Sequence, residues 1–411
     1  MPMNRRFFLH KGALALAGTT AIPQFLVRTV VAQAAAVAPG KRLVVIFQRG
    51  AADGLNIVVP FREKNYYSMR PSIAIPQNQV IALDGFFGLH PAMTAFKPLY
   101  DAGHLAIVHA AGSPDMSRSH FDAQDFMESG TPGLKSTDDG WLNRALQAED
   151  AVHRREHSAF RALALGAEVP RTLTGKVPAI ALSNVNNFAV GGQKPSQAAT
   201  AFEAMYGASG DQIFHATGEE TFDAVKMLRA ANPAQYKPTV DYPNTDFGNS
   251  MKQIAQLLKA NLGVEAAFTD VNGWDTHQNQ GNVNGQLADR LRDFSNSIAA
   301  FWRDMGDEAG NITLVTMSEF GRTAKENGTG GTDHGHANAM FVLGADVKGG
   351  KVHGHWPGLE KEQLNEGRDL ALTTDYRQVL GEVVTHTLGA SNLDIVFPNA
   401  RIAPDRFLRL V

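Results

Sequence analysis

Residues 41–48 read Lys-Arg-Leu-Val-Val-Ile-Phe-Gln, and Gly50 follows them closely. This short run of apolar and β-branched residues, bounded by a glycine, predicts a buried strand. Runs of the same type recur along the chain, at Leu105–His109, Ala179–Leu182, Ala266–Thr269, Ile312–Met317 and Met340–Leu343. Between them lie segments that are typical of helices, at Ser119–Ser129, Met251–Leu262, Leu287–Met305 and Tyr376–Leu388. Buried strands that alternate with helices predict an α/β fold, a three-layer sandwich around a mostly parallel central sheet.

The composition excludes several classes of protein. The chain has 411 residues, 44% of them hydrophobic, and a formal net charge of −3. This is an ordinary globular composition, which excludes a disordered or collagen-like chain. The balanced charge gives no electrostatic footprint for nucleic acid. The chain has no cysteine, so disulfides, thiolate metal sites and cysteine nucleophiles are excluded.

The first residues are typical of an export signal. Arg5-Arg6 is followed by Phe-Phe-Leu, then by a moderately apolar stretch and the small-x-small site Ala32-Gln33-Ala34. The pattern predicts a twin-arginine signal peptide over residues 1–34, with an ordinary Sec signal or an N-terminal anchor as alternatives. Glycine, proline and arginine interrupt the apolar stretch, which makes it too weak for a stable membrane span. We therefore expect a periplasmic or secreted protein that meets the twin-arginine export machinery already folded.

The remainder of the chain, residues 41–411, is expected to form a single domain. Residues 185–250 are rich in glycine, asparagine and proline, and we interpret them as a cap or insertion over the main sheet. Residues 322–337 are polar and glycine-rich, and this segment is too long for a connection without a function.

Polar residues collect where the predicted strands end, and ligands of open α/β sheets bind outside the carboxyl ends of strands. The first strand leads to Arg49-Gly50-Ala51-Ala52-Asp53, whose carboxylate is either a ligand or the cap of a turn. The second leads to Ser117-Arg118-Ser119-His120. The start of a helix presents free N–H groups that suit an anion or a nucleophilic oxygen. The alternative for Ser119 is a simple N-cap.

Three further clusters carry the residue types that bind metals. Asp275 and His277, two residues apart in a loop, can converge on one cation. Glu319 and Arg322 flank a glycine after a strand, and the segment before the last strand offers Asp333, His334 and His336. Carboxylates and imidazoles without thiolates suit Zn²⁺, Mn²⁺, Mg²⁺ or Ca²⁺. The sequence therefore predicts a divalent metal as cofactor. A separate pair, His353 and His355, is expected in a surface loop.

Taken together, these motifs resemble the DUF1501 family of exported bacterial proteins. The matching stretches are LVVIFQRGAADGLNIVVP (43–60), SRSHFDAQD (117–125), GWDTH (273–277), TMSEFGRT (316–323), GTDHGH (331–336) and the segment 349–358. That family is in turn distantly similar to the alkaline phosphatase and sulfatase superfamily. The resemblance implies an alkaline phosphatase-like fold.

The same resemblance implies roles for individual residues. Asp53 would bind one metal, and a second metal would be held by Asp275 and His277 together with His334 or His336. Ser119, or else Ser117, would occupy the position of the nucleophile.

One departure from the superfamily pattern concerns Glu319, which stands where the superfamily often has an Asp-His dyad. Phe320 follows it, so the second metal would lose a nitrogen ligand. This departure weakens the case for two-metal phosphatase chemistry and leaves room for a one-metal hydrolase.

The implied activity is metal-dependent hydrolysis of phosphate or sulfate esters, with an anionic small molecule or a glycan ester as substrate. A metal would activate Ser119 or a water. Arg118, Arg322 or Arg49 would clamp the anionic oxygens, and His120 or another histidine of the pocket would protonate the leaving group. The alternatives are a non-catalytic periplasmic protein of the same fold that binds a metal or a glycan, and a different metal enzyme such as a phosphoglycan transferase or an isomerase.

Overall fold

The structure is a computed structural model that describes residues 40–150, 157–185 and 235–411. The strands of the main sheet are β1 (Arg42–Arg49), β5 (Leu105–Gly112), β6 (Ala162–Leu165), β7 (Ile180–Leu182), β8 (Ala266–Asn272), β9 (Ile312–Ser318), β10 (Asn338–Gly344), β11 (Val352–His353) and β12 (Thr374–Asp375). A small second sheet contains β2 (Val58–Val59), β3 (Ile81–Ala82) and β4 (Gly88–Leu89). The described α-helices are α3 (Gly54–Ile57), α4 (Lys64–Met69), α5 (Lys97–Asp101), α6 (His120–Ser129), α7 (Trp141–Asp150), α11 (Asp246–Lys259), α12 (Gln286–Met305), α13 (Tyr376–Leu388) and α14 (Leu393–Val396).

The main sheet is mostly parallel, as the sequence predicts. Its nine strands run in the order β11-β5-β10-β9-β1-β8-β6-β7, and β12 also pairs with β5. β10 is antiparallel to both of its neighbours, β5 and β9, whereas the other pairs are parallel. Because β10 runs backwards, its first residues lie at the edge where β1, β5, β8 and β9 end. The polar segment before β10 is thereby brought to the carboxyl ends of the other strands.

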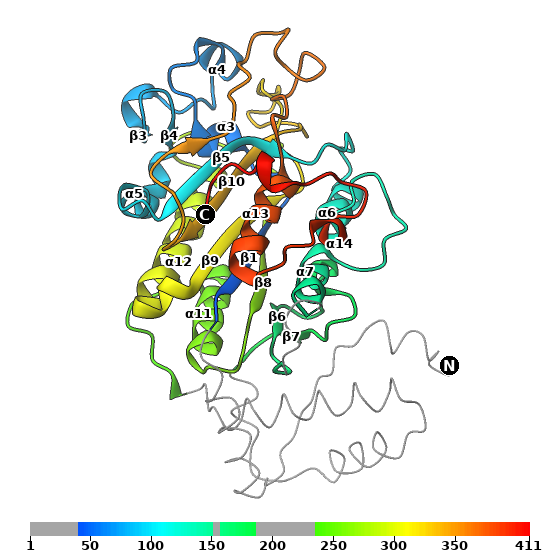
Figure 1. Ribbon diagram of the computed structural model, residues 1–411. Coiled ribbons are helices and arrows are strands. Elements are labelled where there is room, and N and C mark those ends of the chain that lie inside the picture. The colour runs from blue at the N-terminus through cyan, green and yellow to red at the C-terminus, as the bar shows by residue number, and fades with distance from the viewer. Residues whose placement is uncertain (1–39, 151–156, 186–234) are drawn as a thin grey trace, which may run out of the picture.

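Helices cover both faces of the sheet, so the three-layer prediction is confirmed (Figure 1). β1 lies in the middle, and its side chains alternate between two cores. Val44 and Ile46 pack with residues of α11 and α12, while Leu43, Val45 and Phe47 pack with residues of α7 and α13. This alternation follows from the two-residue period of a strand, and it requires that β1 be apolar on both faces.

The ends of the helices follow local capping rules. Ser119 caps α6, since its side chain accepts a hydrogen bond from the Asp122 N–H, and Gly130 ends the helix at φ 69°. α11 begins five residues before the predicted start at Met251, because the Thr245 side chain accepts from the Gly248 N–H and caps it there.

β6 and α7 were not predicted. β6 reads Ala-Leu-Ala-Leu, without the β-branched residues that mark a strand.

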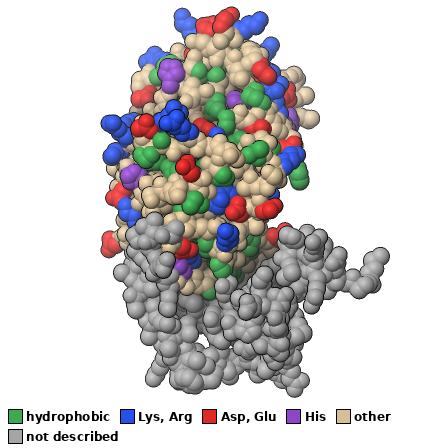
Figure 2. All heavy atoms as spheres, turned by 45° about the vertical axis from the view of Figure 1, so that its right-hand side comes forward, with side chains coloured by type: hydrophobic (Ala, Val, Ile, Leu, Met, Phe, Trp, Pro, Cys, Tyr) green, Lys and Arg blue, Asp and Glu red, His purple; other side chains and the backbone are tan. Residues whose placement is uncertain are grey.

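Two predictions lie wholly or largely outside the described residues, namely the signal peptide over 1–34 and the cap over 185–250. Among the helices that the structure does describe, none has the length and apolar character needed to cross a membrane. On the face drawn in Figure 2, acidic and basic side chains of the described part are interspersed.

His109 on β5 makes the fold sensitive to pH. Its Nε2 lies 2.9 Å from the Val58 carbonyl oxygen, and its Nδ1 accepts a hydrogen bond of 2.8 Å from the Ala110 N–H. Only a neutral ring satisfies both contacts. Burial, which outweighs the hydrogen bond to Val58, lowers the pKa of His109 from 6.5 to about 4.

We predict that the free energy of unfolding falls as the pH drops below 6.5, because the unfolded chain then binds the proton that the folded ring excludes. The loss attributable to His109 approaches about 3 kcal/mol near pH 4. Urea unfolding at a series of pH values should show this slope, and His109→Gln should flatten it, since an amide can also donate and accept. An unchanged slope in His109→Gln would contradict this assignment.

Candidate functional site

The predicted clusters meet at the carboxyl edge of the main sheet. Asp275 and His277 follow β8, Glu319 and Arg322 follow β9, and His120 is the first residue of α6, which follows β5. The segment with His334 precedes the antiparallel β10 and is held to the loop after β9 by a bridge between Arg322 and His334. Residues from distant parts of the sequence therefore face one another.

The Asp275 carboxylate lies at the centre of this group. Its Oδ1 lies 3.1 Å from the His277 Nε2 and 3.3 Å from the His334 Nε2. It also accepts a hydrogen bond of 2.7 Å from the Arg322 Nη2. The other oxygen, Oδ2, lies 3.5 Å from the His120 Nε2. Burial raises the pKa of Asp275, but the charges of Arg322 and the histidines outweigh it and hold the pKa below its usual value.

The second nitrogen of each ring decides the tautomers. Each Nδ1 faces an acceptor oxygen: Glu319 Oε1 at 2.8 Å from His120, Asp333 Oδ1 at 3.1 Å from His277, and the Arg118 carbonyl at 2.7 Å from His334. In a neutral ring the proton is then on Nδ1, and the Nε2 lone pair faces Asp275. The Nε2 atoms of His277 and His334 are only 3.0 Å apart. Lone pairs that converge in this way on a carboxylate are satisfied by a positive charge between them, either a proton on one ring or a metal ion.

The donor set fits a divalent metal. The ligand atoms of His120, Asp275 and His334 all lie within 4.8 Å of one another. The His120 Nε2 is buried and has no hydrogen-bond partner. Imidazole and carboxylate ligands suit Zn²⁺, and rings that are oriented by acceptors on their far nitrogen are usual around metals.

Glu319 holds His120 in place. Its side chain is fully buried, and its Oε1 accepts hydrogen bonds of 2.8 Å from Gly50 N–H and Gln124 Nε2 as well as facing His120. Burial raises the pKa of Glu319, but these hydrogen bonds outweigh it and keep the pKa below its ordinary value. In return, the hydrogen bond with Glu319 raises the pKa of His120. Glu319 thus stands behind His120, away from Asp275.

Arg322 offers free donors beside Asp275. Its guanidinium is buried, and apart from the bond to Asp275 its Nη2 lies 3.4 Å from the Trp274 carbonyl. Its Nε and Nη1 are buried without hydrogen-bond partners. Burial lowers the pKa of Arg322. Two unpaired guanidinium nitrogens at this place can receive the oxygens of an anion.

Phe320 supplies an apolar wall. Its ring stacks on His120 at 5.0 Å between centroids and lies 5.1 Å from the ring of His334. The position that the resemblance assigns to an imidazole is therefore filled by a ring that packs on two of the histidines.

Asp53 does not belong to the group of close ligand atoms formed by His120, Asp275 and His334. Its Oδ2 accepts 2.7 Å hydrogen bonds from Arg70 Nη1 and Gln280 Nε2. Arg70 is fully buried and also donates to the Ala324 and Thr323 carbonyls. The Asp53 Oδ1 is buried without a partner. Asp53 is therefore paired with a buried arginine, and one of its oxygens remains without a partner.

The other residues predicted for the site do not contact the Asp275 carboxylate within the described part of the chain. The Arg118 guanidinium donates to Glu366 and Asp369. Ser119 is exposed at the start of α6, and His336 is buried. Asp333 touches His277 on the side away from Asp275.

Arg49 donates to Asp270, Gln124 and Glu128. The prediction of a surface loop is wrong for His353, which is buried in β11 with its Nε2 3.1 Å from the Lys348 carbonyl.

Sequence reasoning missed the residues that support the site from a distance, chiefly Arg70, Gln124 and Gln280. Each touches a predicted residue that is far from it in sequence, as Gln280 touches Asp53. Gln124 falls inside the SRSHFDAQD stretch, and its place one turn after His120 on a helix is the one local signal for it.

A family model described as "Protein of unknown function (DUF1501)" matches residues 40–389. The chain belongs to the DUF1501 family. No curated protein matches it. Among solved structures, it is similar to the C-terminal periplasmic domain of EcEptC from Escherichia coli in complex with Zn, with a TM-score of 0.35 and 11% identity over 75% of this chain and 73% of that one.

A second similar structure is the PsFucS1 sulfatase from Pseudoalteromonas sp., with a TM-score of 0.35 and 13% identity over 84% of this chain and 72% of that one. Both likenesses are distant, and neither assigns an activity to the DUF1501 chain.

We predict that Arg70→Met destabilises the protein by about 3–5 kcal/mol, because it leaves the buried Asp53 carboxylate without its cation. Urea unfolding measures this loss. The matched control is Lys97→Met, which breaks an ion pair with Asp101 that is partly exposed and should change stability by less than about 1 kcal/mol. Equal effects of the two substitutions would contradict the structural role of the Asp53–Arg70 pair.

Proposed function

We propose that this DUF1501 protein is an exported, metal-dependent hydrolase of phosphate or sulfate esters. One observation carries the proposal: the Nε2 atoms of His120, His277 and His334 face the Asp275 carboxylate while each Nδ1 faces an acceptor. This arrangement supports a single divalent cation, most simply Zn²⁺, held by Asp275 and the three imidazoles. His120 then acts as a ligand, in place of the proton donor that the sequence suggested.

The chain's own groups give this centre its chemistry. A bound divalent metal would supply a Lewis acid and lower the pKa of a coordinated hydroxyl. Arg322 would hold the anionic oxygens of the ester through its two unpaired nitrogens. Glu319 and Asp333 keep the rings of His120 and His277 in their orientation.

Ser119 directly precedes His120 in the sequence. Its Oγ accepts a hydrogen bond from the Asp122 N–H, so its own proton remains free for a base. Its place at the N-terminus of α6 favours a negative charge on that oxygen. A metal-activated water is the alternative nucleophile.

The second candidate function is a non-catalytic metal- or glycan-binding member of the same family. It is favoured by Arg118, whose guanidinium is engaged by Glu366 and Asp369, and by Phe320, which fills the space beside the histidines. Export by the twin-arginine route belongs to the proposal in either case and rests on the motif at Arg5-Arg6.

We predict that protein purified from its export compartment and loaded with zinc retains about one equivalent of metal, and that Asp275→Ala/His334→Ala loses it. Elemental mass spectrometry gives the stoichiometry. The matched control is His157→Ala, which removes a histidine from the other acidic group, Glu149, His157 and Glu265. Arg161 already occupies that group through ion pairs with Glu149 and Glu265, so the control should keep its metal.

The absence of metal from carefully loaded wild-type protein would overturn the metal centre. Loss of metal from His157→Ala, with retention in the double variant, would move the centre to the other group.

We predict hydrolysis of 4-nitrophenyl phosphate or 4-nitrophenyl sulfate by the zinc-loaded protein, and a fall of about 100-fold in kcat/KM for Arg322→Gln, since an anion would lose its clamp. Release of nitrophenolate measures both. Arg118→Gln is the control. The Arg118 guanidinium is already paired with two carboxylates, so its removal should lower kcat/KM far less. Metal content is measured in each variant.

Ser119→Ala separates the two nucleophiles. A loss as large as that of Arg322→Gln assigns the attack to the serine, and retained activity assigns it to water. Metal binding without turnover of either ester would contradict the hydrolase proposal and favour the second candidate function, a non-catalytic metal- or glycan-binding protein.

A further inference from the structure

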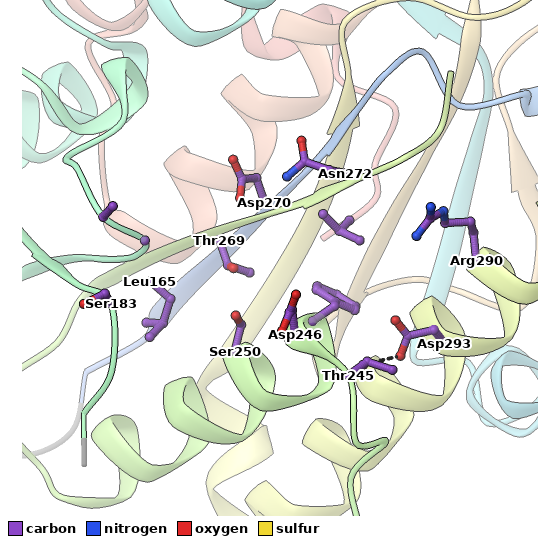
Figure 3. Close-up of a pocket in the computed structure, with 14 residues that line it drawn as sticks. Leu165, Ser183, Thr245, Asp246, Ser250, Thr269, Asp270, Asn272, Arg290 and Asp293 are labelled. Atoms are coloured by element: carbon purple, nitrogen blue, oxygen red, sulfur yellow. Dashed lines mark hydrogen bonds between the residues drawn. The ribbon is translucent and has the colours of Figure 1, made fainter. Parts of the chain in front are cut away.

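A cavity of about 690 Å³ lies at the carboxyl ends of β6 and β8. The first turns of α11 and α12 form its other walls (Figure 3). Its volume is that of a site for an organic ligand. None of the residues assigned above to the metal centre lines it.

Several polar groups of this cavity lack partners. Thr269 on β8 lines the cavity and is only 1% exposed, yet no side chain or backbone group of the described residues hydrogen-bonds its hydroxyl. Figure 3 shows it facing the same space as Ser250 and Asp246 of α11, whose side chains are likewise without hydrogen bonds in the described part of the chain. A buried hydroxyl without a partner is rare in folded proteins. The arrangement therefore points to a ligand with hydrogen-bonding groups.

The charge of the lining selects the kind of ligand. The carboxylates of Asp246 and Asp293 lie at the cavity together with the guanidinium of Arg290, whereas the Asp270 side chain points to the other side of β8 (Figure 3). Arg290 donates through Nε to the Gly273 carbonyl at 3.1 Å. Acceptor oxygens and hydroxyls therefore predominate, which favours a ligand rich in donors and disfavours an anion.

The two carboxylates at the cavity keep acceptor capacity for a ligand. Asp246 makes no hydrogen bond within the described residues, whereas Asp270 is paired with Arg49 at 2.6 Å on the other side of β8. Asp293 accepts from Thr245 Oγ1 at 2.7 Å and from Ser297 Oγ at 3.1 Å, both through Oδ1. A carboxylate can accept several hydrogen bonds, so neighbouring hydroxyls of one ligand can share it.

We infer that this cavity is a binding site for a sugar ring that is neutral or carries an amino group. A ring with hydroxyls on several sides matches acceptors that come from β8, α11 and α12 at once. An ammonium group on the ring would lie among carboxylates that outnumber the single arginine.

The cavity is also connected to the metal centre. β8 ends at Asn272, which lines the cavity, and Asp275 follows three residues later in the loop. A chain of contacts runs from Asp270 through Arg49 and Gln124 to Glu319. If the proposed hydrolase function holds, the sugar bound here is the organic part of the ester; this last step rests on that function, whereas sugar binding itself does not.

The test compares three sugars of one size and different charge. Calorimetric titration of the full, zinc-loaded chain with D-glucosamine, D-glucose and D-glucuronate should give saturable binding in that order of affinity, with glucuronate the weakest. Thr269→Val, which keeps the shape and removes the hydroxyl, should weaken the binding of D-glucose about tenfold, the effect of one lost hydrogen bond in a buried site. Asp246→Asn, at an exposed position, should reduce the preference for glucosamine over glucose.

The controls separate this inference from the proposed function. Asp275→Ala should lose zinc and keep sugar binding, so a protein that binds sugar but cleaves no ester would retain the cavity assignment and lose the hydrolase. The assignment is overturned if none of the three sugars binds, if glucuronate binds most tightly, or if Thr269→Val and Asp246→Asn both bind as the wild type does.

Discussion

The convergence of three imidazole nitrogens on one carboxylate is the constraint around which the carboxyl edge of the sheet is built. Asp275 meets His120, His277 and His334 only because β5, β8 and β9 end at one edge and β10 begins there. A parallel β10 would carry His334 to the opposite edge. The one antiparallel strand of the main path is therefore what closes the group.

Close packing behind the ligands keeps this geometry fixed. Gly50 lies at φ +116°, and a Cβ there would fall 2.9 Å from the Asp275 backbone nitrogen. A Cβ at Gly321 would fall 1.9 Å from the Ala337 carbonyl oxygen. Both glycines allow loops from different strands to touch, and the Gly50 N–H also supports Glu319. The glycines of the motifs are thus required by contacts between loops, in addition to the turns themselves.

The sequence predicted the parts of the site whose signal is local. Asp275 with His277, and Asp333 with His334, stand out because ligand types recur within a few residues next to a strand. Arg70 and Gln280 carry no such signal, because their role is to donate hydrogen bonds to Asp53, which is distant from both in the sequence. The same division holds for the fold. The β-branched residues of β1 predict a strand from the sequence alone. The Ala-Leu-Ala-Leu segment of β6 has no such signal and forms a strand through its pairing with β7 and β8.

The charges decide how many cations the centre can hold. The Asp275 carboxylate lies among three imidazole nitrogens, and Arg322 adds a positive charge beside it. Asp53, the carboxylate that a second cation would need, is already neutralised by the buried Arg70. One divalent cation and Arg322 together balance the carboxylates of Asp275, Glu319 and Asp333, so the guanidinium is the local positive group that an anionic ester would meet. A second cation would have only the unpartnered Asp53 Oδ1 to bind, beside the buried Arg70 guanidinium, whose positive charge would repel it. The buried pair therefore favours a one-metal site, with the guanidinium of Arg322 and not a second ion as the other contact for the anion.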